Sequence, residues 1–485
     1  MNVADGPKQL TSTETAIPGL TLWDLPVHGD SRGWFKENWQ REKMTALGLP
    51  DFGPVQNNIS FNATVGTTRG IHAEPWDKWV SVATGRIFGA WVDLREGPTF
   101  GAVVTAEIDP SRAVFVPRGV GNAFQTLEEG TAYSYLVNAH WSPDAEYALL
   151  NLADETVAVP WPIPLDQAEV SDKDKGHPPL DAITPVRQRR TVIIGSKGQL
   201  GRALEAELAH DHVLDLVDRE ELDISSPTLA TDYPWHEVNV ILNAAAYTAV
   251  DVAETPEGRA DAWAANASAP AALARIAAEH RITLVHVSSD YVFDGSSTMP
   301  YTEGEPFAPL GVYGQSKAAG DIAVAGAPKH YIVRTSWVIG DGKNFVRTMA
   351  GLAGRGVAPS VVDDQVGRLT FTADLARGIR HLVETAAPYG TYNLTGSGEP
   401  ASWATVASEV YDLVAAGSVP GVTAVDGIAG SSVTPVSTAE YFASATVPVA
   451  PRPANSVLDM AKIEATGFIA RDWRESLEEY LHQSR

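Results

Sequence analysis

Residues 191–201, TVIIGSKGQLG, decide the fold of the second half of this 485-residue chain. Four β-branched residues predict a buried strand, and a glycine turn leads from this strand into the helical pattern QLGRALEAELAH at 199–210. Gly195, Gly198 and Gly201 would let the backbone approach a pyrophosphate, which the positive end of the helix then stabilises. The stretch therefore predicts a nucleotide-binding strand–turn–helix unit.

The same alternation continues downstream. The strand patterns VNVILNAAA (238–246) and ITLVHVSSD (282–290) lie on either side of an Ala-rich helical pattern at 259–280. Strands that alternate with helices predict a doubly wound parallel sheet, so residues 191–485 are expected to form an α/β Rossmann domain.

The front of the chain has a different pattern. Short apolar runs are separated by Gly, Pro and Asp turn residues, as in WVSVATG (79–85), IFGAWVDL (87–94), AVVTAEI (102–108) and AVFVP (113–117). This spacing predicts an all-β sandwich or barrel over residues 15–180. The polar, proline-containing segment that follows predicts a linker at 181–190.

Composition excludes several classes of function. The chain has no cysteine, which excludes disulfides, thiolate catalysis and Cys-ligated zinc. Acidic residues outnumber basic ones 60 to 36, and no basic stripe indicates nucleic-acid binding. No apolar run reaches the roughly 20 residues that span a membrane, and no signal peptide is visible, so we expect a cytoplasmic protein. With a net charge of −24, an anionic substrate would need local Arg and Lys side chains.

Three side chains in the α/β domain suit the reduction of a ketone. Ser289 follows a predicted strand, and Tyr313 and Lys317 lie one helical turn apart on one face. A hydride added to a ketone carbon leaves an alkoxide, to which a tyrosine can give a proton if a neighbouring ammonium lowers its pKa. A serine hydroxyl can hold the carbonyl oxygen. The pattern predicts a nicotinamide-dependent reductase.

The choice between NADH and NADPH stays open. Asp218 or Asp223 follows the glycine turn by about 20 residues, where the cofactor ribose would lie. Arg219 beside it would favour a 2′-phosphate.

Residues 191–485 also resemble the extended short-chain dehydrogenase/reductases, and within them the dTDP-4-dehydrorhamnose reductases. The matching segments include NAAAYTAVDVAE, HVSSDYVFDG, VYGQSKAAGD, VRTSWVIG, VVDDQVGRLT and PRPANSVLD. The resemblance implies Tyr313 as proton donor, Lys317 as its partner and Ser289 as the third catalytic group. It implies cofactor contacts from Gly195, Gly198, Gln199, Leu200, Asp223, Ile224, Ala244, Ala245 and Tyr247, and substrate contacts from Val250 and Trp337. Some reductases of this family are reported to use magnesium, but no residue cluster in the sequence indicates a metal site.

The front domain holds Arg69, His72 and Lys78 within ten residues, in VQNNISFNATVGTTRGIHAEPWDKWV (55–80). A metal-binding cupin would offer His-x-His, whereas His72 is followed by Ala73 and Glu74, so no metal is expected. For an isolated histidine, the simplest interpretation is a hydrogen-bonded residue of the barrel.

The neighbouring motifs favour a catalytic role instead. DSRGWFKE, WVDLREGPTFG, VFVPRGVGNAF, YLVNAHWSP and VSDKD resemble the dTDP-4-dehydrorhamnose 3,5-epimerases, which are metal-free cupins with a jelly-roll barrel. The resemblance implies His72 as the base, Asp174 as its partner, Lys78 at the enolate oxygen and Tyr135 as the second proton donor. It implies substrate contacts from Arg32, Glu37, Gln56, Asn58, Arg69 and Trp141. Two departures are a shorter His72–Lys78 loop and Asn122, where the family usually has a histidine.

Together the two resemblances imply consecutive steps, 3,5-epimerisation and then reduction of one 4-keto sugar nucleotide to dTDP-L-rhamnose. Three alternatives stay open: a non-catalytic front barrel, a UDP-linked substrate, and a back half that is a 4-epimerase or dehydratase. Since epimerases of the front type are usually dimers, a homodimer through the cupin domain is expected.

Overall fold

The computed structural model describes residues 9–140, 147–187, 190–210, 212–385, 387–423, 429–446 and 448–483. The chain divides into two compact units, residues 1–188 and 189–485. Each unit has hydrophobic clusters of its own, so each has the core that an independent domain requires.

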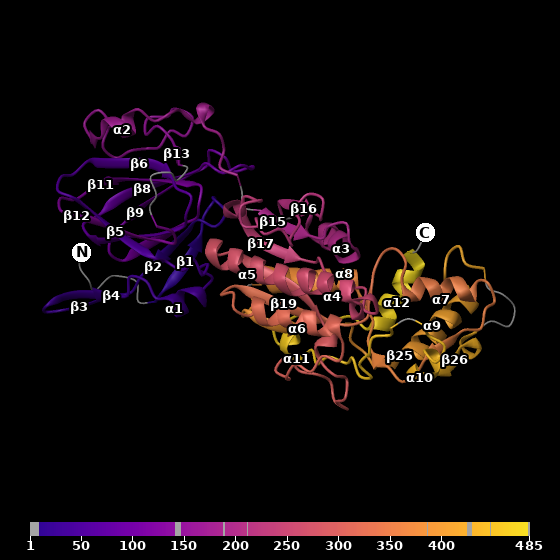
Figure 1. The fold of residues 1–485 in the computed structure, drawn as a ribbon. Helices are drawn as coiled ribbons and strands as arrows, with labels where there is room; N and C mark the ends of the chain where they lie inside the picture. The colour runs from indigo at the N-terminus through magenta and orange to yellow at the C-terminus, as the bar shows by residue number, and fades with distance from the viewer. Residues whose placement is uncertain are drawn as a thin grey trace. The chain divides into compact units, whose positions relative to one another are not determined.

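The first unit is built from two antiparallel sheets (Figure 1). In spatial order, one sheet contains β1 (Thr11–Glu14), β2 (Thr21–Asp24), β10 (Arg112–Val116), β7 (Lys78–Thr84), β12 (Thr131–Val137) and β5 (Gln56–Asn62). The other contains β13 (Ala148–Leu149), β6 (Thr67–Ala73), β11 (Val120–Thr126), β8 (Ile87–Asp93) and β9 (Val103–Ile108). The short β14 (Glu169–Val170) adds to β6 in parallel. This arrangement confirms the predicted all-β barrel class.

Alternating side chains explain why the two sheets face each other. Val80 and Val82 of β7, Trp91 of β8 and Phe124 of β11 belong to one buried cluster in this unit. The edge strand β5 alternates along its length, and it exposes Ile59 on its outer face. Outside the two sheets lie the hairpin of β3 (Val27–Asp30) and β4 (Gly33–Lys36), and the short helices α1 (Arg41–Thr45) and α2 (Asp172–Lys175).

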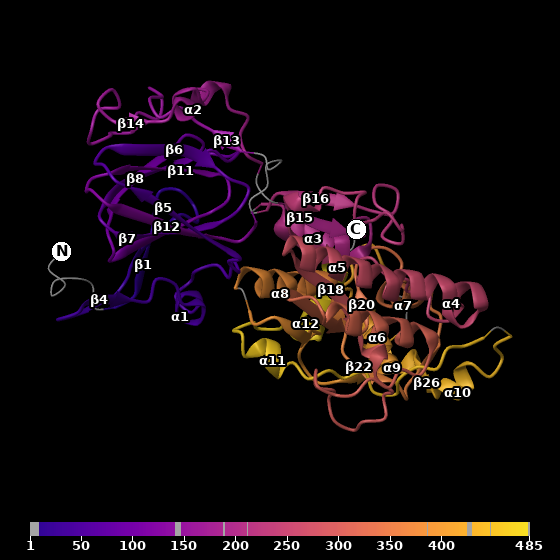
Figure 2. The same cartoon turned by 60° about the vertical axis from the view of Figure 1, so that its left-hand side comes forward.

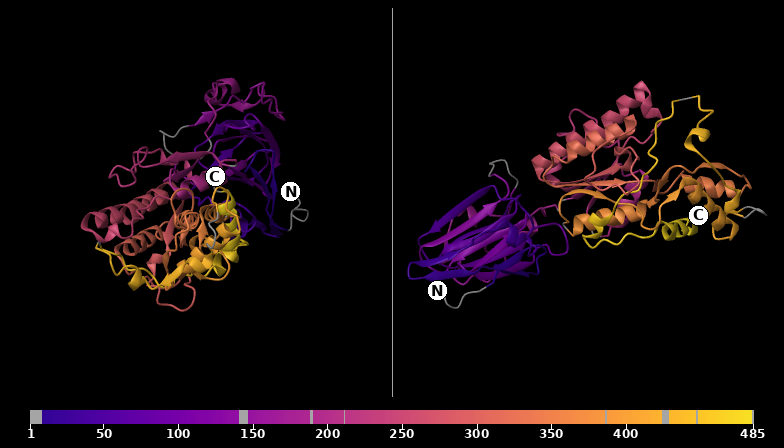
Figure 3. Two further views of the ribbon diagram at one scale, coloured as in Figure 1. Left: turned by 90° about the vertical axis from the view of Figure 1, so that its right-hand side faces the viewer. Right: turned by 90° about the horizontal axis from the view of Figure 1, so that it is seen from below.

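The second unit contains a six-stranded parallel sheet (Figure 2). In spatial order its strands are β16 (Leu214–Val217), β15 (Arg190–Ile194), β17 (Val238–Asn243), β18 (Thr283–Ser289), β19 (His330–Thr335) and β24 (Gly390–Asn393). The helices that pack with it include α3 (Gln199–Leu208), α5 (Ala269–His280), α6 (Val312–Val324), α8 (Thr372–Glu384) and α11 (Ala461–Glu464), and α4 (Pro256–Trp263) packs against α6. Helices lie on both faces of the sheet in the right-hand view of Figure 3. The predicted doubly wound fold is confirmed.

The strand order places the nucleotide-binding turn at a defined edge. The first strand of this sheet in the sequence is β15. The next strand, β16, pairs on one side of β15, and the strand after it, β17, pairs on the other side. In open α/β sheets, ligands bind beyond the carboxyl ends of the strands where the order reverses, which here is between β15 and β17.

A smaller part of this unit packs around α7 (Phe345–Ala353), α9 (Trp403–Ala415) and α12 (Trp473–Gln483). Its short strands are β20 (Val338–Ile339), β21 (Ser360–Val362), β22 (Val366–Gly367), β23 (Thr370–Phe371), β25 (Ala401–Ser402) and β26 (Thr434–Val436), and α10 (Thr438–Tyr441) follows them. Among the described residues, no helix is long and apolar enough to cross a membrane.

Candidate active sites

A histidine–aspartate pair lies on the first unit. His72 is on β6, between its register partners Asn122 on β11 and Leu149 on β13. Its Nε2 lies 3.0 Å from Oδ1 of Asp174. Ser171 caps the short helix α2 by accepting the Asp174 backbone N–H at 3.1 Å, which holds Asp174 in place. The structure thus joins two residues that are 102 positions apart in the sequence.

The surroundings keep His72 neutral. Burial lowers the pKa of His72, and the hydrogen bond and charge of Asp174 oppose this effect without reversing it. A carboxylate partner raises the basicity of an imidazole, but here burial has the larger effect. Since 32% of the His72 side chain is exposed, the neutral ring can still reach a substrate.

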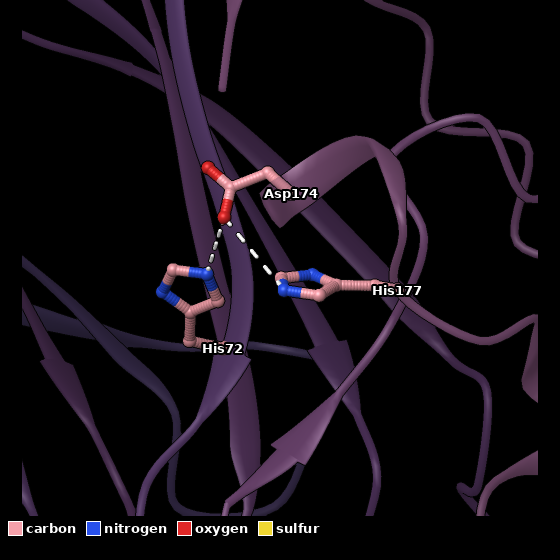
Figure 4. Close-up of side chains that lie close together, drawn as sticks. All are labelled: His72, Asp174 and His177. Atoms are coloured by element: carbon pink, nitrogen blue, oxygen red, sulfur yellow. Dashed lines mark hydrogen bonds and ion pairs between the residues drawn. The ribbon is translucent and has the colours of Figure 1, made fainter. Parts of the chain in front are cut away.

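A second buried histidine shares the carboxylate (Figure 4). His177 is 7% exposed, and its Nε2 lies 3.7 Å from Oδ1 of Asp174. The rings of His72 and His177 are 5.2 Å apart between centroids. Neither ring nitrogen of His177 has a hydrogen-bond partner among the described residues.

Lys78 and Tyr135 form a neighbouring group. Lys78, at the start of β7, is 4% exposed, and its Nζ lies 2.5 Å from Oε2 of Glu74. The same ammonium lies 5.7 Å from the centre of the Tyr135 ring on β12. Burial raises the pKa of Tyr135, and the charge of Glu74 raises it further, so the phenol keeps its proton. Glu74 also accepts a hydrogen bond from Trp76 Nε1 at 2.8 Å.

Asn122 is part of the barrel's hydrogen-bond network. Its Oδ1 accepts from Trp91 Nε1 at 2.9 Å, and its Nδ2 donates to the Tyr133 hydroxyl at 3.0 Å. A buried amide can satisfy both partners at once because it carries a donor and an acceptor. The residue that departs from the family pattern therefore stabilises the sheet beside His72.

The other predicted substrate residues of this unit are more scattered. Gln56 donates to Asn58 at 2.9 Å on β5, and Arg69 of β6 donates to Asn62 at 3.2 Å. Arg32 pairs with Asp30 in the β3–β4 hairpin, and Glu37 pairs with Lys43 at 2.6 Å. Figures 1 and 2 place this hairpin on the side of the unit away from α2 and from β6, the strand that carries His72. Trp141 lies outside the described residues.

In the second unit, the glycine turn lies where the sheet order reverses. Gly195 has a φ of 81°, and a Cβ there would meet the Ala245 backbone nitrogen at 2.8 Å. A Cβ on Gly201 would meet the Gly195 carbonyl oxygen at 2.2 Å. Gly198 is the N-cap of α3, and Gln199 and Leu200 are the first two residues of this helix. No side chain described in the structure caps it. Its free N–H groups suit an anionic phosphate.

The other predicted cofactor residues lie on loops at the same edge. Asp218 directly follows β16 and accepts the Lys197 backbone N–H at 3.1 Å, which ties it to the glycine turn. Asp223 instead accepts from Ser225 at 2.6 Å, and Ile224 packs on the core. Ala244, Ala245 and Tyr247 follow β17. The fully buried Asn266 accepts the Tyr247 N–H at 2.9 Å and donates to Ser316 of α6 at 3.1 Å.

The three predicted catalytic residues of this unit lie on β18 and α6. Ser289 ends β18 and donates to Oδ1 of Asp290 at 2.9 Å. Burial, together with the charge of Asp290 and against a hydrogen bond with Ser289, raises the pKa of Tyr313 to about 12. Burial also raises the pKa of Asp290 to about 6, against hydrogen bonds from Ser456 and Ser289. Tyr313 is therefore fully protonated at neutral pH.

Lys317 is enclosed by the protein. It is 2% exposed and donates to the Val287 carbonyl at 2.7 Å. Burial lowers the pKa of Lys317 to about 8, and the charge of Asp321, one turn further along α6, opposes this. Asp321 is 1% exposed and accepts from Arg334 at 2.9 Å. Arg334 lies near the rings of Phe293 and Phe307.

Trp337 and Val250 lie on loops beyond the sheet. Trp337 follows β19 with a φ of 46° and stacks on Trp403 at 3.8 Å between centroids. Val250 is half-buried in the loop that connects β17 to α4.

Comparison with known families and proteins assigns the two units. The model of the dTDP-4-dehydrorhamnose 3,5-epimerase family matches residues 14–182, and that of the RmlD substrate binding domain matches residues 189–485. An RmlC homolog of Streptococcus pyogenes is 52% identical over 180 residues, which are 36% of this chain and 90% of that protein. The chain is a fusion of an RmlC epimerase domain with an RmlD reductase domain.

Two reductases support the second assignment. The dTDP-4-dehydrorhamnose reductase of Aggregatibacter actinomycetemcomitans is 37% identical over 304 residues, which are 59% of this chain and 97% of that protein. The crystal structure of the Bacillus anthracis dTDP-4-dehydrorhamnose reductase in complex with NADP is 33% identical, with a TM-score of 0.53. The matched region covers 61% of this chain and 98% of the Bacillus anthracis reductase. The RmlD domain therefore belongs to an NAD(P)H-dependent reductase family.

Several residues that contact the predicted site residues in the structure were not identified from the sequence. In the RmlC domain these are Glu74, which neutralises Lys78, and His177, three positions after Asp174. In the RmlD domain they are Asn266 and Asp321. The four-residue spacing of Glu74–Lys78 and Lys317–Asp321 was a visible signal, whereas nothing in the local sequence marks Asn266.

Proposed function

We propose that this chain catalyses two consecutive steps of dTDP-L-rhamnose synthesis. The RmlC domain epimerises C3 and C5 of dTDP-4-dehydro-6-deoxy-D-glucose, and the RmlD domain then reduces the C4 ketone. The observation that carries the proposal is the His72–Asp174 hydrogen bond of 3.0 Å, in a chain whose second domain also places Ser289, Tyr313 and Lys317 on β18 and α6. A domain that only bound the sugar would have no need for a buried carboxylate behind its histidine.

In the epimerase step, neutral His72 removes a proton from the carbon beside the ketone, and Asp174 stabilises the resulting imidazolium. The ammonium of Lys78 stabilises the enolate oxygen, for which it must partly leave Glu74. Tyr135 retains its proton because burial raises its pKa, and it returns a proton to the opposite face. Arg69, Gln56 and Asn58 supply polar contacts for the substrate.

The reductase step uses the edge between β15 and β17. The uncapped start of α3 and the close approach of Gly195 to Ala245 suit the pyrophosphate of a dinucleotide. The reduced nicotinamide, when bound, supplies the hydride. Ser289 holds the ketone oxygen, and Tyr313 gives its proton to the alkoxide. Lys317, as an ammonium, stabilises the phenolate that remains.

We also propose that the chain acts as a homodimer through the RmlC domain. The large apolar residues Phe35, Ile59 and Phe61 are each at least 65% exposed on β4 and β5. A second copy would cover them, and it would give Arg32 of the same hairpin a site to reach. Analytical ultracentrifugation of the full chain tests this, since a monomer at micromolar concentration would contradict it.

The direct test follows absorbance at 340 nm with NADPH and enzymatically made dTDP-4-dehydro-6-deoxy-D-glucose, with no other enzyme added. Steady oxidation, lost separately in His72→Ala and Tyr313→Phe, is the expected result. Oxidation only after an external epimerase is added would leave the reductase alone and make the barrel a binding module. Parallel reactions with the UDP-linked sugar test the choice of nucleotide.

A further inference from the structure

The strongest unassigned feature of the RmlC domain is the cluster of His72, Asp174 and His177 (Figure 4). One ligand atom from each residue lies within 4.8 Å of the other two. The epimerase chemistry uses His72 and Asp174, but it gives no task to His177. The side chain of His177 is nonetheless buried and directed at the shared carboxylate oxygen.

Burial without a partner makes His177 the informative residue. A buried imidazole normally donates or accepts at least one hydrogen bond, because an unpaired buried polar atom costs free energy. Within the described part of the chain, both ring nitrogens of His177 lack a hydrogen-bond partner, and Nε2 approaches Asp174 only to 3.7 Å. A cation that accepts the electron pair of a His177 ring nitrogen would satisfy this residue. The Asp174 carboxylate lies beside His177 Nε2, where it could bind the same cation.

We propose that His72, Asp174 and His177 bind one divalent transition-metal ion of the zinc class, and that this ion inhibits epimerisation. Such ions bind two imidazoles and one carboxylate, and this ligand set leaves further coordination positions open. The ion occupies the nitrogen of His72 that faces Asp174, so the dyad that removes the proton is broken. The inhibitory consequence rests on the proposed function, whereas the binding itself does not.

The distances suit this interpretation. Zinc lies about 2.0–2.1 Å from imidazole nitrogen and carboxylate oxygen, so two ligand atoms at a tetrahedral angle are about 3.4 Å apart. The two Asp174–histidine separations, 3.0 and 3.7 Å, lie on either side of that value. The partly exposed side of His72 leaves room for water in the remaining position.

Local charge also permits a cation. Asp174 brings a negative charge, and the nearby Lys78 is neutralised by its ion pair with Glu74. His72 lies on β6, Asp174 lies on the capped helix α2 that follows β14, and His177 comes directly after the C-cap residue of that helix. The site differs from the His-x-His pattern of metal-binding cupins, which explains why sequence inspection found no metal motif.

Calorimetric titration of the EDTA-dialysed full chain with ZnCl₂ tests the binding. We expect one ion per chain, and we expect Co²⁺ to give a visible absorption spectrum that Zn²⁺ abolishes by competition. His177→Gln and Asp174→Asn should each lose this ion, while His28→Gln, at an exposed histidine of the same domain, should bind as the wild type does. Circular dichroism confirms that each variant is folded. Absent binding in the wild type, or unchanged binding in both folded ligand variants, would overturn the proposal.

The inhibition is measured as solvent deuterium incorporation into the sugar nucleotide. Zn²⁺ should suppress the exchange, EDTA should restore it, and His177→Gln should exchange protons in the presence of Zn²⁺. Metal binding without any exchange in the metal-free chain would contradict the epimerase function and leave the metal site standing. Exchange that Zn²⁺ does not affect would contradict the inhibition.

Discussion

The two domains hold their proposed catalytic groups in different ways. In the RmlC domain, His72 and Asp174 are already hydrogen-bonded to each other, 3.0 Å apart. In the RmlD domain, Lys317 donates to the Val287 carbonyl and Ser289 donates to Asp290. The histidine and its carboxylate partner are therefore joined in the first site. In the second site Tyr313 is hydrogen-bonded to Ser289, but the Lys317 ammonium is bonded to a backbone carbonyl. We therefore expect the cofactor and the substrate to complete the second site.

The largest effect is expected for Tyr313→Phe. Loss of the proton donor should lower NADPH-dependent reduction by roughly 10²–10⁴-fold, while the hydrogen-bonded pair in the other domain is untouched. Deuterium incorporation into the sugar nucleotide should continue at the wild-type rate. If that deuterium exchange also fell, the two active sites would not be independent of each other.

Asp174→Asn should have a smaller effect, and it should lower the epimerase step instead of the reduction. The amide still fills the site but no longer stabilises the imidazolium of His72, so deuterium exchange should fall roughly 10²-fold. Reduction of pre-epimerised substrate should stay unchanged, and this serves as the internal control. Full exchange activity in this variant would show that the preformed dyad is not the catalytic base.

Asp321→Asn should change the pH dependence of reduction. In the proposed mechanism Lys317 acts as an ammonium, so activity should be present below its pKa of about 8 and should be lost as the pH rises through that value. Because the charge of Asp321 opposes the lowering by burial, its removal should move the alkaline limb to lower pH.

The groups around Lys317 make this prediction specific. Tyr313 precedes Lys317 by one turn of α6, His286 on β18 is buried with its pKa well below 6.5, and Arg334 on β19 pairs with Asp321. The kcat profile between pH 6 and 10 measures the shift, with exposed Glu305→Gln as the matched control. An unmoved alkaline limb in Asp321→Asn would mean that another group titrates there.

The smallest effect is a stability change in one domain. Asn122→Ala leaves the buried Trp91 N–H and the Tyr133 hydroxyl without a partner, which should cost about 1–3 kcal/mol. Calorimetry should show a lower melting transition for the RmlC domain and an unchanged one for the RmlD domain. A lowered transition in both domains would show that their stabilities are coupled.

The sequence predicted the fold of both domains because their patterns are local. The glycine turn at 195–201 and the alternating strands and helices need only neighbouring residues to be recognised. The His72–Asp174 pair was reached only through a family resemblance, since no local rule relates residues 102 positions apart.

Other features depend on packing, which no spacing reveals. Burial outweighs the effect of Asp174 on the pKa of His72, and it raises the pKa of Tyr313 to about 12 where a lowering by Lys317 was expected. Arg32, predicted to contact the substrate, lies in the β3–β4 hairpin, on the side of the unit away from β6 and α2. The roles of these residues stay predictions.

Complementation tests the central claim, two independent active sites in one chain, most directly. His72→Ala and Tyr313→Phe chains are assayed separately and then mixed, with NADPH and dTDP-4-dehydro-6-deoxy-D-glucose. Each variant alone should leave NADPH unoxidised, and the mixture should produce dTDP-L-rhamnose, because each supplies the step that the other lacks. A mixture as inactive as each variant alone would contradict the account, provided that His72→Ala still reduces pre-epimerised substrate and Tyr313→Phe still exchanges deuterium.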